Sequence, residues 1–399
     1  MRTLADPTRR PPTANDSARR TLDVLICGGG VAAVEAALAL RDLAADRVAI
    51  TIVSPRPDFV LAPLAVGAPF AFAHVPRRPL ADIARELNAE YVDAAVAHID
   101  TDGHRVRLSD ESTLDYDALL LATGARRCPP FDHVQTFVEG DSAALHGLLA
   151  DLEEGWSSSA AFVVPPGVSW TVPAYELALL TARQTRSMGM TDVQITVITP
   201  EACPLALFGP RASAAAAQLL ERAGVAVIAD AYVQSVIPGR GVALAPGHRM
   251  FDVERVVTLP RVEGLRISGV PHDHDGFVPV DEHARVIGVE DVFAAGDGTD
   301  FPVKQGGLAT QQADAAAEMI AQRAGATLTP HPFRPVLRGW LMTGGTPRFF
   351  ATPIAGGAGP GEVSTQPLWS PATKVAGRYL APWLGRQLPS ATKPPTMAP

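Results

Sequence analysis

Three consecutive glycines, Gly28 to Gly30, interrupt an apolar segment, and the small residue Ala33 follows three positions later. This G-x-G-x-x-A spacing suits a dinucleotide phosphate. The first glycine permits a tight turn, the second lets the backbone approach the pyrophosphate, and the small third residue allows close packing. The N-terminus of a following helix would supply free N–H groups and a favourable dipole. The spacing alone leaves FAD and NAD both open, with a flexible glycine loop as the alternative.

The segments around the glycines form a suitable frame. Residues 22–27 read as a buried strand, 31–44 as a helix rich in Ala and Leu, and 48–53 as a second strand. This βαβ context favours the dinucleotide turn over a flexible loop. We interpret Glu35 as a first-turn helix residue favoured by the dipole. The second strand would normally end in an Asp or Glu that binds the ribose, whereas this chain offers Ser54, which could make one weaker hydrogen bond.

Strands and helices continue to alternate along the chain, so we predict an α/β fold. It consists of two Rossmann-like dinucleotide-binding domains, each in three layers, with the second inserted in the first, and of a C-terminal cap. We place the first domain at 21–127 and 280–329, the second at 128–279, and an interface or membrane-facing region at 330–399. Further strands are predicted at 95–99, 104–108, 117–122, 161–165, 193–198, 225–229, 231–237, 241–244, 254–259, 291–297, 336–342 and 347–352, and further helices at about 173–187, 211–223 and 307–324.

Composition limits the classes of function. The 399 residues are 47% hydrophobic and 19% charged, which is enough apolar material for a large core. The net charge of −8 comes without any long basic cluster, which argues against a nucleic-acid partner. The three cysteines Cys27, Cys128 and Cys203 are an odd number without a C-x-x-C motif. They fit a reducing compartment, such as the cytoplasm, and no disulfide framework.

Two segments lie outside the predicted domains or between their elements. Residues 1–20 are rich in Arg and Pro and carry no apolar run, so we expect a disordered leader. Residues 59–76 carry no formal charge, but Pro63, Pro69 and Pro76 would break a membrane-spanning helix. We therefore interpret 59–76 as an apolar loop beside a cofactor.

A late motif decides between the two dinucleotides. Residues 291–297 read D-V-F-A-A-G-D, and together with the turn Ala122-Thr123-Gly124 they resemble motifs of the FAD-dependent pyridine nucleotide-disulfide oxidoreductases. The resemblance implies that Asp297, after Gly296, binds the ribityl chain of FAD and that Thr123 and Gly124 form the intermediate motif. A carboxylate at the end of a strand can accept hydrogen bonds from sugar hydroxyls. We therefore predict bound FAD, with Val96 also among its contacts.

From about residue 22 to 388 the chain resembles the sulfide:quinone oxidoreductase and type II NADH dehydrogenase group of that superfamily. The resemblance implies that FAD accepts two electrons from NAD(P)H or another small reductant and passes them to a quinone or similar acceptor. It places Lys304, Gln305 and Gly306 near the pyrimidine side of the flavin. Lys304 is the candidate catalytic residue, because its charge would stabilise the anionic reduced ring. The matching segments are 53–63, 173–178, 199–209, 304–307 and 374–382.

Location and assembly stay open at this level. The resemblance implies a protein that is either free in the cytoplasm or peripheral on the inner face of the cell membrane. A homodimer is compatible with it. Aromatic and basic residues mix near the C-terminus, where they suit either a membrane interface or a packed terminal helix or dimer contact. They are Lys374, Arg378, Tyr379, Trp383 and Arg386.

The chain departs from this group at two positions. Sulfide oxidation in the group uses cysteines beside the flavin, but Trp170 stands where one is expected, which argues against that activity. The second domain should also carry its own glycine motif. Here Pro165 and Pro166 remove two N–H donors, and only Gly167 remains. Glu201 could still hold a ribose, so NAD(P)H stays open as the donor.

Two further alternatives follow. The protein could be a flavin-binding module that senses redox state or serves a partner subunit without efficient turnover.

Residues 272–275 read His-Asp-His-Asp, but four consecutive loop residues cannot converge on one ion without contortion. We expect a polar turn there and no metal site.

Overall fold

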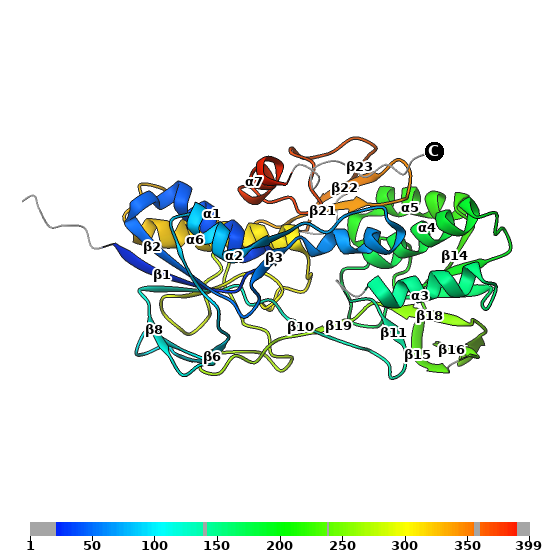
Figure 1. The fold of residues 1–399 in the computed structure, drawn as a ribbon, viewed down its shortest axis with the longest axis horizontal. Helices are drawn as coiled ribbons and strands as arrows, with labels where there is room; N and C mark the ends of the chain where they lie inside the picture. The colour runs from blue at the N-terminus through cyan, green and yellow to red at the C-terminus, as the bar shows by residue number, and fades with distance from the viewer. Residues whose placement is uncertain (1–20, 139–141, 238, 355–359, 389–399) are drawn as a thin grey trace, which may run out of the picture.

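The computed structural model describes residues 21–138, 142–237, 239–354 and 360–388. Two five-stranded parallel sheets lie side by side, and a small antiparallel sheet packs beside both of them (Figure 1). The predicted leader (1–20), the tail after residue 388 and most of the predicted glycine-rich loop near 355–361 lie outside the described residues.

The first sheet has the order β20-β9-β1-β2-β5, with every neighbouring pair parallel. Its strands are short and apolar, which is typical of strands buried on both faces. Alternate residues of one strand point to opposite faces. Its strands are β1 (Leu22–Cys27), β2 (Val48–Val53), β5 (Glu90–Val92), β9 (Ala118–Leu121) and β20 (Val292–Ala294).

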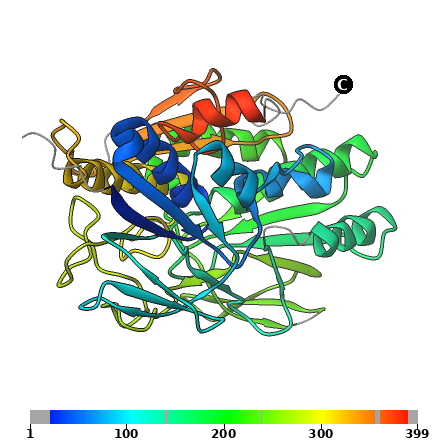
Figure 2. The ribbon, with the colours of Figure 1, turned by 60° about the vertical axis from the view of Figure 1, so that its left-hand side comes forward.

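Helices cover one face of this sheet and a meander covers the other (Figures 1 and 2). Val24 and Ile26 of β1 pack into the same core as the helices α1 (Val31–Ala44) and α6 (Gly306–Arg323). Leu25 and Cys27 point instead toward β6 (Val96–Asp100), β7 (Arg105–Leu108) and β8 (Thr113–Asp115). The first domain is therefore three-layered, as predicted.

The second sheet has the order β11-β18-β12-β13-β14 and is also parallel throughout. Because β20 returns to pair with β9 in the first sheet, the second sheet is an insertion in the first domain, as predicted. The linking segments pair with each other as β10 (Arg126–Cys128) and β19 (Arg261–Glu263). Its strands are β11 (Gln135–Thr136), β12 (Ser159–Val163), β13 (Gln194–Ile198), β14 (Val225–Ile228) and β18 (Arg255–Thr258).

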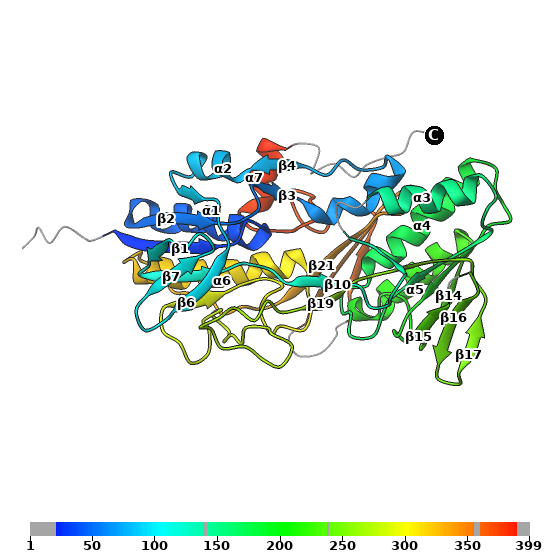
Figure 3. The same ribbon diagram turned by 60° about the horizontal axis from the view of Figure 1, so that its bottom comes forward.

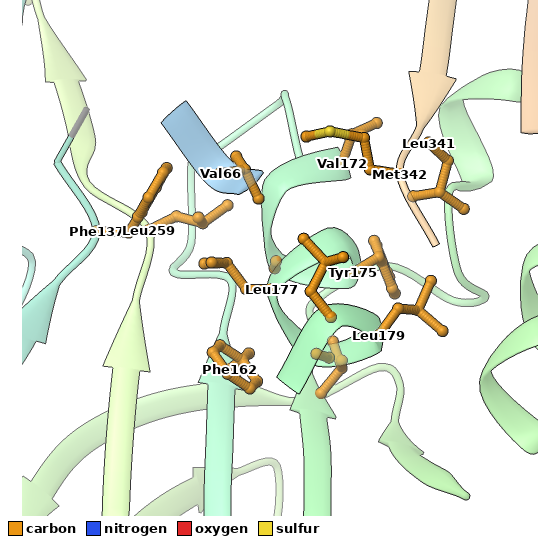
Figure 4. Packing of buried hydrophobic residues seen from close by; sticks show 14 of the residues in the cluster. Val66, Phe137, Phe162, Val172, Tyr175, Leu177, Leu179, Leu259, Leu341 and Met342 are labelled. Carbon is orange, nitrogen blue, oxygen red and sulfur yellow. The ribbon is translucent and has the colours of Figure 1, made fainter. Parts of the chain in front are cut away.

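The layers of the first domain recur around the second sheet (Figure 3). Helices lie on one face, where Phe162 packs against α4 in the cluster that Figure 4 shows. An antiparallel sheet lies on the other face. The helices are α3 (Ser142–Glu153), α4 (Val172–Ser187) and α5 (Pro210–Arg222), and the strands are β15 (Tyr232–Ile237), β16 (Gly241–Ala245) and β17 (Arg249–Phe251).

The C-terminal part is an antiparallel sheet followed by a packed helix. The sheet consists of β21 (Val336–Leu341), β22 (Arg348–Pro353) and β23 (Glu362–Ser364), and the helix is α7 (Leu380–Gln387). Trp383 of α7 is buried, stands edge-on to Phe59 and donates its indole N–H to Glu86 Oε1 at 2.9 Å. This end of the chain therefore includes a packed terminal helix.

Most of the uncharged segment 59–76 is neither strand nor α-helix, although its first two residues belong to β3. It forms a 3₁₀ segment, η2 (Ala62–Phe70), whose residues reach from the first core to the second: Leu64 packs with the first domain and Val66 with α4. No helix in the described part of the chain has the length and apolar character that crossing a bilayer requires. The remaining elements are η1 (Ala45–Arg47), β3 (Asp58–Val60), β4 (Arg77–Pro79), α2 (Leu80–Glu86) and η3 (Ala206–Phe208).

Candidate functional site

The first glycine of the early motif makes the turn that ends β1. The Gly28 N–H donates to Val53 O at 2.8 Å, and its φ of +137° is one that glycine adopts freely. A Cβ on Gly28 would lie only 2.0 Å from Ala122 O. Position 28 therefore admits no side chain, since β1 and the turn after β9 approach too closely there.

The second motif glycine has open space in front of it. Gly30 is the N-cap of α1, with no side-chain capping bond, and a Cβ at this position would meet no atom within 4 Å. Ala33, the third small position, is fully buried between the helix and the sheet. A helix N-terminus with free N–H groups beside open space fits a phosphate.

The three motifs converge at the carboxyl ends of β1, β9 and β20. A Cβ on Gly298 would come within 2.8 Å of Gly124 O and 3.8 Å of Thr123 Oγ1. A Cβ on Gly296 would come within 3.4 Å of Ala32 at the start of α1. Asp297 stands between these two glycines, with a half-buried side chain. In parallel α/β sheets this edge is where ligands bind.

A buried glutamine that we did not single out from the sequence supports this loop. Gln312 of α6 accepts the Gly296 N–H at 2.8 Å and donates to Thr299 Oγ1 at 3.1 Å. One contact holds the backbone just before Asp297, and the other holds the Thr299 hydroxyl, which itself donates to Gly296 O. An alanine-rich helix with several glutamines gave no signal that distinguished this one from its neighbours.

Lys304 lies close to the same loop. Its ammonium group donates to Thr299 O and lies 3.7 Å from the centre of the Phe277 ring. Burial lowers the pKa of Lys304 to about 8, although the carboxylates of Asp297, Asp300 and Asp273 act in the opposite direction. Lys304 is thus a partly desolvated cation next to the late motif.

Gln305 and Gly306 form the start of α6. The Gln305 side chain accepts the Leu308 N–H at 2.9 Å as an N-cap and donates to Arg338 O at 3.2 Å. Gly306 is the first helical residue, and a Cβ there would approach Val375 to 3.1 Å. The amide that we predicted to reach the flavin edge already has two protein partners.

Ser54 and Val96 occupy less open positions. Ser54 is buried, and its hydroxyl accepts from Arg56 N at 3.1 Å and donates to Arg56 O at 3.0 Å. This local turn uses the group that we predicted to bind a ribose. Val96 is half-buried on β6, against the core that includes Cys27.

Glu35 does not have the role that its position suggested. It lies beyond the first turn of α1, is fully buried, and accepts the backbone N–H of Tyr379 at 2.9 Å and that of Leu380. Asp314 of α6 shares this site, and burial and the neighbouring Glu35 raise the pKa of Asp314 to about 9. The dipole interpretation was therefore wrong: Glu35 anchors the C-terminal helix.

A buried ion pair joins the second domain to the C-terminal sheet. Glu176 of α4 accepts the Met342 N–H at 2.7 Å and pairs with the buried Lys374 ammonium, which also donates to Trp340 O. Burial raises the pKa of Glu176, against the lowering effect of Lys374. Lys374, one of the mixed aromatic and basic residues near the C-terminus, is a core residue.

The cysteines are far apart in environment, and the described residues hold no metal-ligand cluster. Cys27 is fully buried in β1, and burial raises the pKa of its thiol to about 12. Cys128 is half-buried and Cys203 exposed. Asp273 accepts the N–H groups of Asp275 and Phe277 at 2.9 Å each, so 272–275 is a turn, as expected. Within the described ranges no three His, Cys, Asp or Glu side chains gather as a ligand set.

The fold and the converging motifs define a dinucleotide-binding oxidoreductase. The chain belongs to the pyridine nucleotide-disulphide oxidoreductase family, whose sequence model matches residues 22–319. Family membership implies a bound flavin, FAD. The residues present fit that cofactor: an open helix N-terminus at Gly30, and Asp297 held at the same sheet edge.

Similar proteins come from the two groups named above. A sulfide-quinone reductase of Aquifex aeolicus is 31% identical over 188 residues, which cover 45% of this chain and only 43% of that protein. An NADH dehydrogenase-like protein of Mycobacterium tuberculosis is 31% identical over 299 residues, 69% of this chain and 72% of that protein.

Solved structures agree with the fold. The sulfide:quinone oxidoreductase of Aquifex aeolicus superposes with a TM-score of 0.78 at 20% identity, over 86% of this chain and 87% of that one. The NDH2 of Plasmodium falciparum, solved in complex with NADH, gives 0.58 at 16% identity, over 70% and 65% of the two chains. At these identities the likeness concerns the fold alone.

Proposed function

We propose that the protein is an FAD-dependent oxidoreductase that takes two electrons from a small donor, NAD(P)H or another reductant, and passes them to a quinone or similar acceptor. The observation that carries the proposal is the meeting of the early, intermediate and late motifs at one sheet edge, beside the open N-terminus of α1. The name of one similar protein includes a quinone, which supports a quinone as the electron acceptor. The name of another includes NADH, which supports NADH as a possible donor.

The chain's own residues would bind and orient the cofactor. The N-terminus of α1 at Gly30 would hold the pyrophosphate, and Asp297 would accept hydrogen bonds from the ribityl hydroxyls. Thr123 and Gly124 line the junction between them. Bound FAD supplies two-electron transfer chemistry, while the protein supplies position, electrostatics and exclusion of water.

Lys304 would act on the charge of the reduced ring. A cation near the N-terminus of α6 stabilises negative charge in its neighbourhood, and partial burial strengthens this effect. We infer that Lys304 raises the reduction potential of the bound flavin. Attachment to the inner face of the cell membrane and a homodimer stay proposals that rest on the sequence resemblance alone.

One experiment tests the proposed function. The purified protein is examined for flavin absorbance, then mixed anaerobically with a panel of small donors and, once reduced, with a soluble quinone analogue. We expect a yellow protein that a donor bleaches and a quinone re-oxidises faster than oxygen does. A yellow protein that no donor bleaches would favour a redox-sensing or partner module, which the loss of the donor-side cysteine at Trp170 suggests. A preparation that stays colourless with excess FAD would contradict both.

A further inference from the structure

The turn after β12 is the structural counterpart of the glycine turn after β1, but its backbone is poorly suited to phosphate. Pro165 and Pro166 have no N–H to donate. The next available donor beyond the glycine, Val168 N, is directed back to Pro165 O at 3.3 Å. Where the first domain offers a glycine-lined helix N-terminus, the second offers a closed turn.

The start of α4 also offers few N–H donors. Pro173 lies in its first turn and donates nothing, and the Ala174 N–H is used by Thr171 O at 3.0 Å. The Ser169 hydroxyl donates to Pro302 O at 2.7 Å, across to the loop that precedes Lys304. A dinucleotide pyrophosphate would need free N–H groups at this helix start. It would also need open space between the turn at Ser169 and the loop at Pro302.

The acidic residue that should bind the adenosine ribose is committed elsewhere. Glu201, after β13, accepts from Tyr175 Oη at 2.7 Å and from Thr199 Oγ1 at 3.2 Å through one oxygen. Its other oxygen accepts the Ala206 N–H at 3.1 Å. Burial raises the pKa of Glu201, against the lowering effect of these donors. A ribose hydroxyl would have to compete with these donors for the Glu201 carboxylate.

We propose that the second domain of this protein does not bind NAD(P)H, and that its first turn instead forms a wall on the donor side of the flavin site, with Trp170 as its aromatic surface. This rests on the proposed function and narrows its donor to a small reductant without a nucleotide. The Trp170 ring is half-buried against Phe208, at 5.9 Å between centroids. It lies next to the Ser169 contact that ties this turn to the flavin-side loop.

Calorimetric titration of the FAD-loaded protein tests the first part. NAD⁺, NADP⁺ and ADP-ribose are the probes, and FAD titrated into the flavin-free protein is the reference. We expect heat from FAD and no saturable heat from any of the three nicotinamide or ribose probes at millimolar concentration. Saturable binding of any of them would overturn the inference. Absence of FAD binding would instead contradict the proposed function, so the two failures are distinct.

Flavin fluorescence tests the wall. An indole close to an isoalloxazine quenches its emission by electron transfer, whereas a phenyl ring does not. We expect Trp170→Phe to raise the fluorescence of bound FAD severalfold. The matched control is Trp156→Phe, because Trp156 follows α3 in the second domain and its side chain is exposed. Equal emission from both variants and the parent would overturn the placement of Trp170. Retained FAD absorbance shows that each variant is folded.

Discussion

Lys304 illustrates how one side chain can combine burial with charge. Its ammonium group is held by a single backbone carbonyl, lies against the Phe277 ring, and has three carboxylates in its neighbourhood. The carboxylates keep it charged near neutral pH, while burial leaves it weakly solvated. Such a cation interacts more strongly with a nearby ligand charge than an exposed lysine would.

We therefore expect Lys304→Met to lower the reduction potential of bound FAD. Loss of one partly buried charge should destabilise the anionic reduced ring by roughly 1.4 kcal/mol, which is about 30 mV for a two-electron couple. Redox titration against a reference dye measures the shift. Arg348→Met, on the C-terminal sheet, is a control that removes a positive charge elsewhere. An unchanged potential in Lys304→Met would remove Lys304 from the flavin site.

The same lysine predicts a pH dependence in the flavin-free protein. Burial lowers the folded-state pKa of Lys304 to about 8, from an ordinary value of 10.5. Between these values the unfolded chain binds more protons than the folded one, so Lys304 makes the free energy of unfolding rise with pH. Urea denaturation at several pH values should show a steeper rise in the parent than in Lys304→Met. Parallel curves would contradict the burial of this ammonium group.

Asp297 is the residue on which cofactor retention should depend most. We expect Asp297→Asn to lose most of its bound flavin during purification, because a neutral amide accepts hydrogen bonds from hydroxyls less strongly than a carboxylate. The control is Asp300→Asn, three residues away on the exposed surface. Flavin absorbance per protein measures occupancy. Equal occupancy in the two variants would show that the late motif does not bind the sugar chain.

At the scale of elements, the strand–turn–helix unit separates folding from binding. Gly28 and Gly30 belong to one motif, yet a side chain at the first would collide with Ala122 O, whereas a side chain at the second would enter open space. Gly30 also has an ordinary backbone conformation, with φ of −90°. The two glycines thus serve different physical purposes.

We expect Gly28→Ala to lower the free energy of unfolding by several kcal/mol, since a 2.0 Å approach cannot be relieved without moving β1 from β9. Gly30→Ala should unfold like the parent without cofactor but bind FAD more weakly, because its methyl group occupies the phosphate space. Chemical denaturation and FAD titration distinguish the two. A stable Gly30→Ala with full FAD affinity would contradict a phosphate at this helix.

The elements that the sequence predicted well have a continuous or periodic pattern of apolar residues, or a glycine that marks where they start. The apolar runs at 22–27 and 48–53 and the alanine-rich helix at 31–44 have the predicted bounds, because buried parallel strands and a glycine start leave little freedom. The helix α3 was missed, since its His146 and Gly147 weaken its pattern, and β3 to β5 were too short to show a period.

At the scale of the whole molecule, Glu176 and Lys374 connect parts of the chain that are far apart in sequence. Their ion pair ties α4 to the segment before α7, and Trp340 O of β21 and the N–H of Met342, just after β21, bind the same pair. Glu176 Oε2 has no hydrogen-bond partner among the described residues. The charge of the buried Glu176 carboxylate is therefore balanced by Lys374.

We expect Lys374→Met to destabilise the protein by about 3–5 kcal/mol, because it leaves an uncompensated charge in the core. Adding Glu176→Gln should restore much of the loss, since the amide can still accept the Met342 N–H. Thermal or urea denaturation of the single and double variants measures the coupling. A double variant as unstable as the single one would show that the charge is not the cause.

How far the site could be predicted follows the same division between local and distant contacts. Gly28, Gly30, Thr123, Gly124 and Asp297 lie in turns whose sequence carries their geometry, and the structure brings them together. Ser54 and Glu201 carry polar groups at the positions that follow β2 and β13, but local hydrogen bonds already use those groups. Gln312 and Lys374 act through contacts with segments that are distant in sequence. A single sequence does not reveal such contacts.

The carboxylate of Glu35 links the C-terminal helix α7 to α1, the first helix of the chain. The helix whose N-terminus faces the open phosphate space also holds, one turn further on, the backbone that starts α7. A protein cut before Gly377 would lose the N–H groups that compensate this carboxylate beside Asp314. Shortening the chain there should thus disturb α1 on the side away from its N-terminus, and a C-terminal deletion could lower cofactor retention through the displacement of this helix.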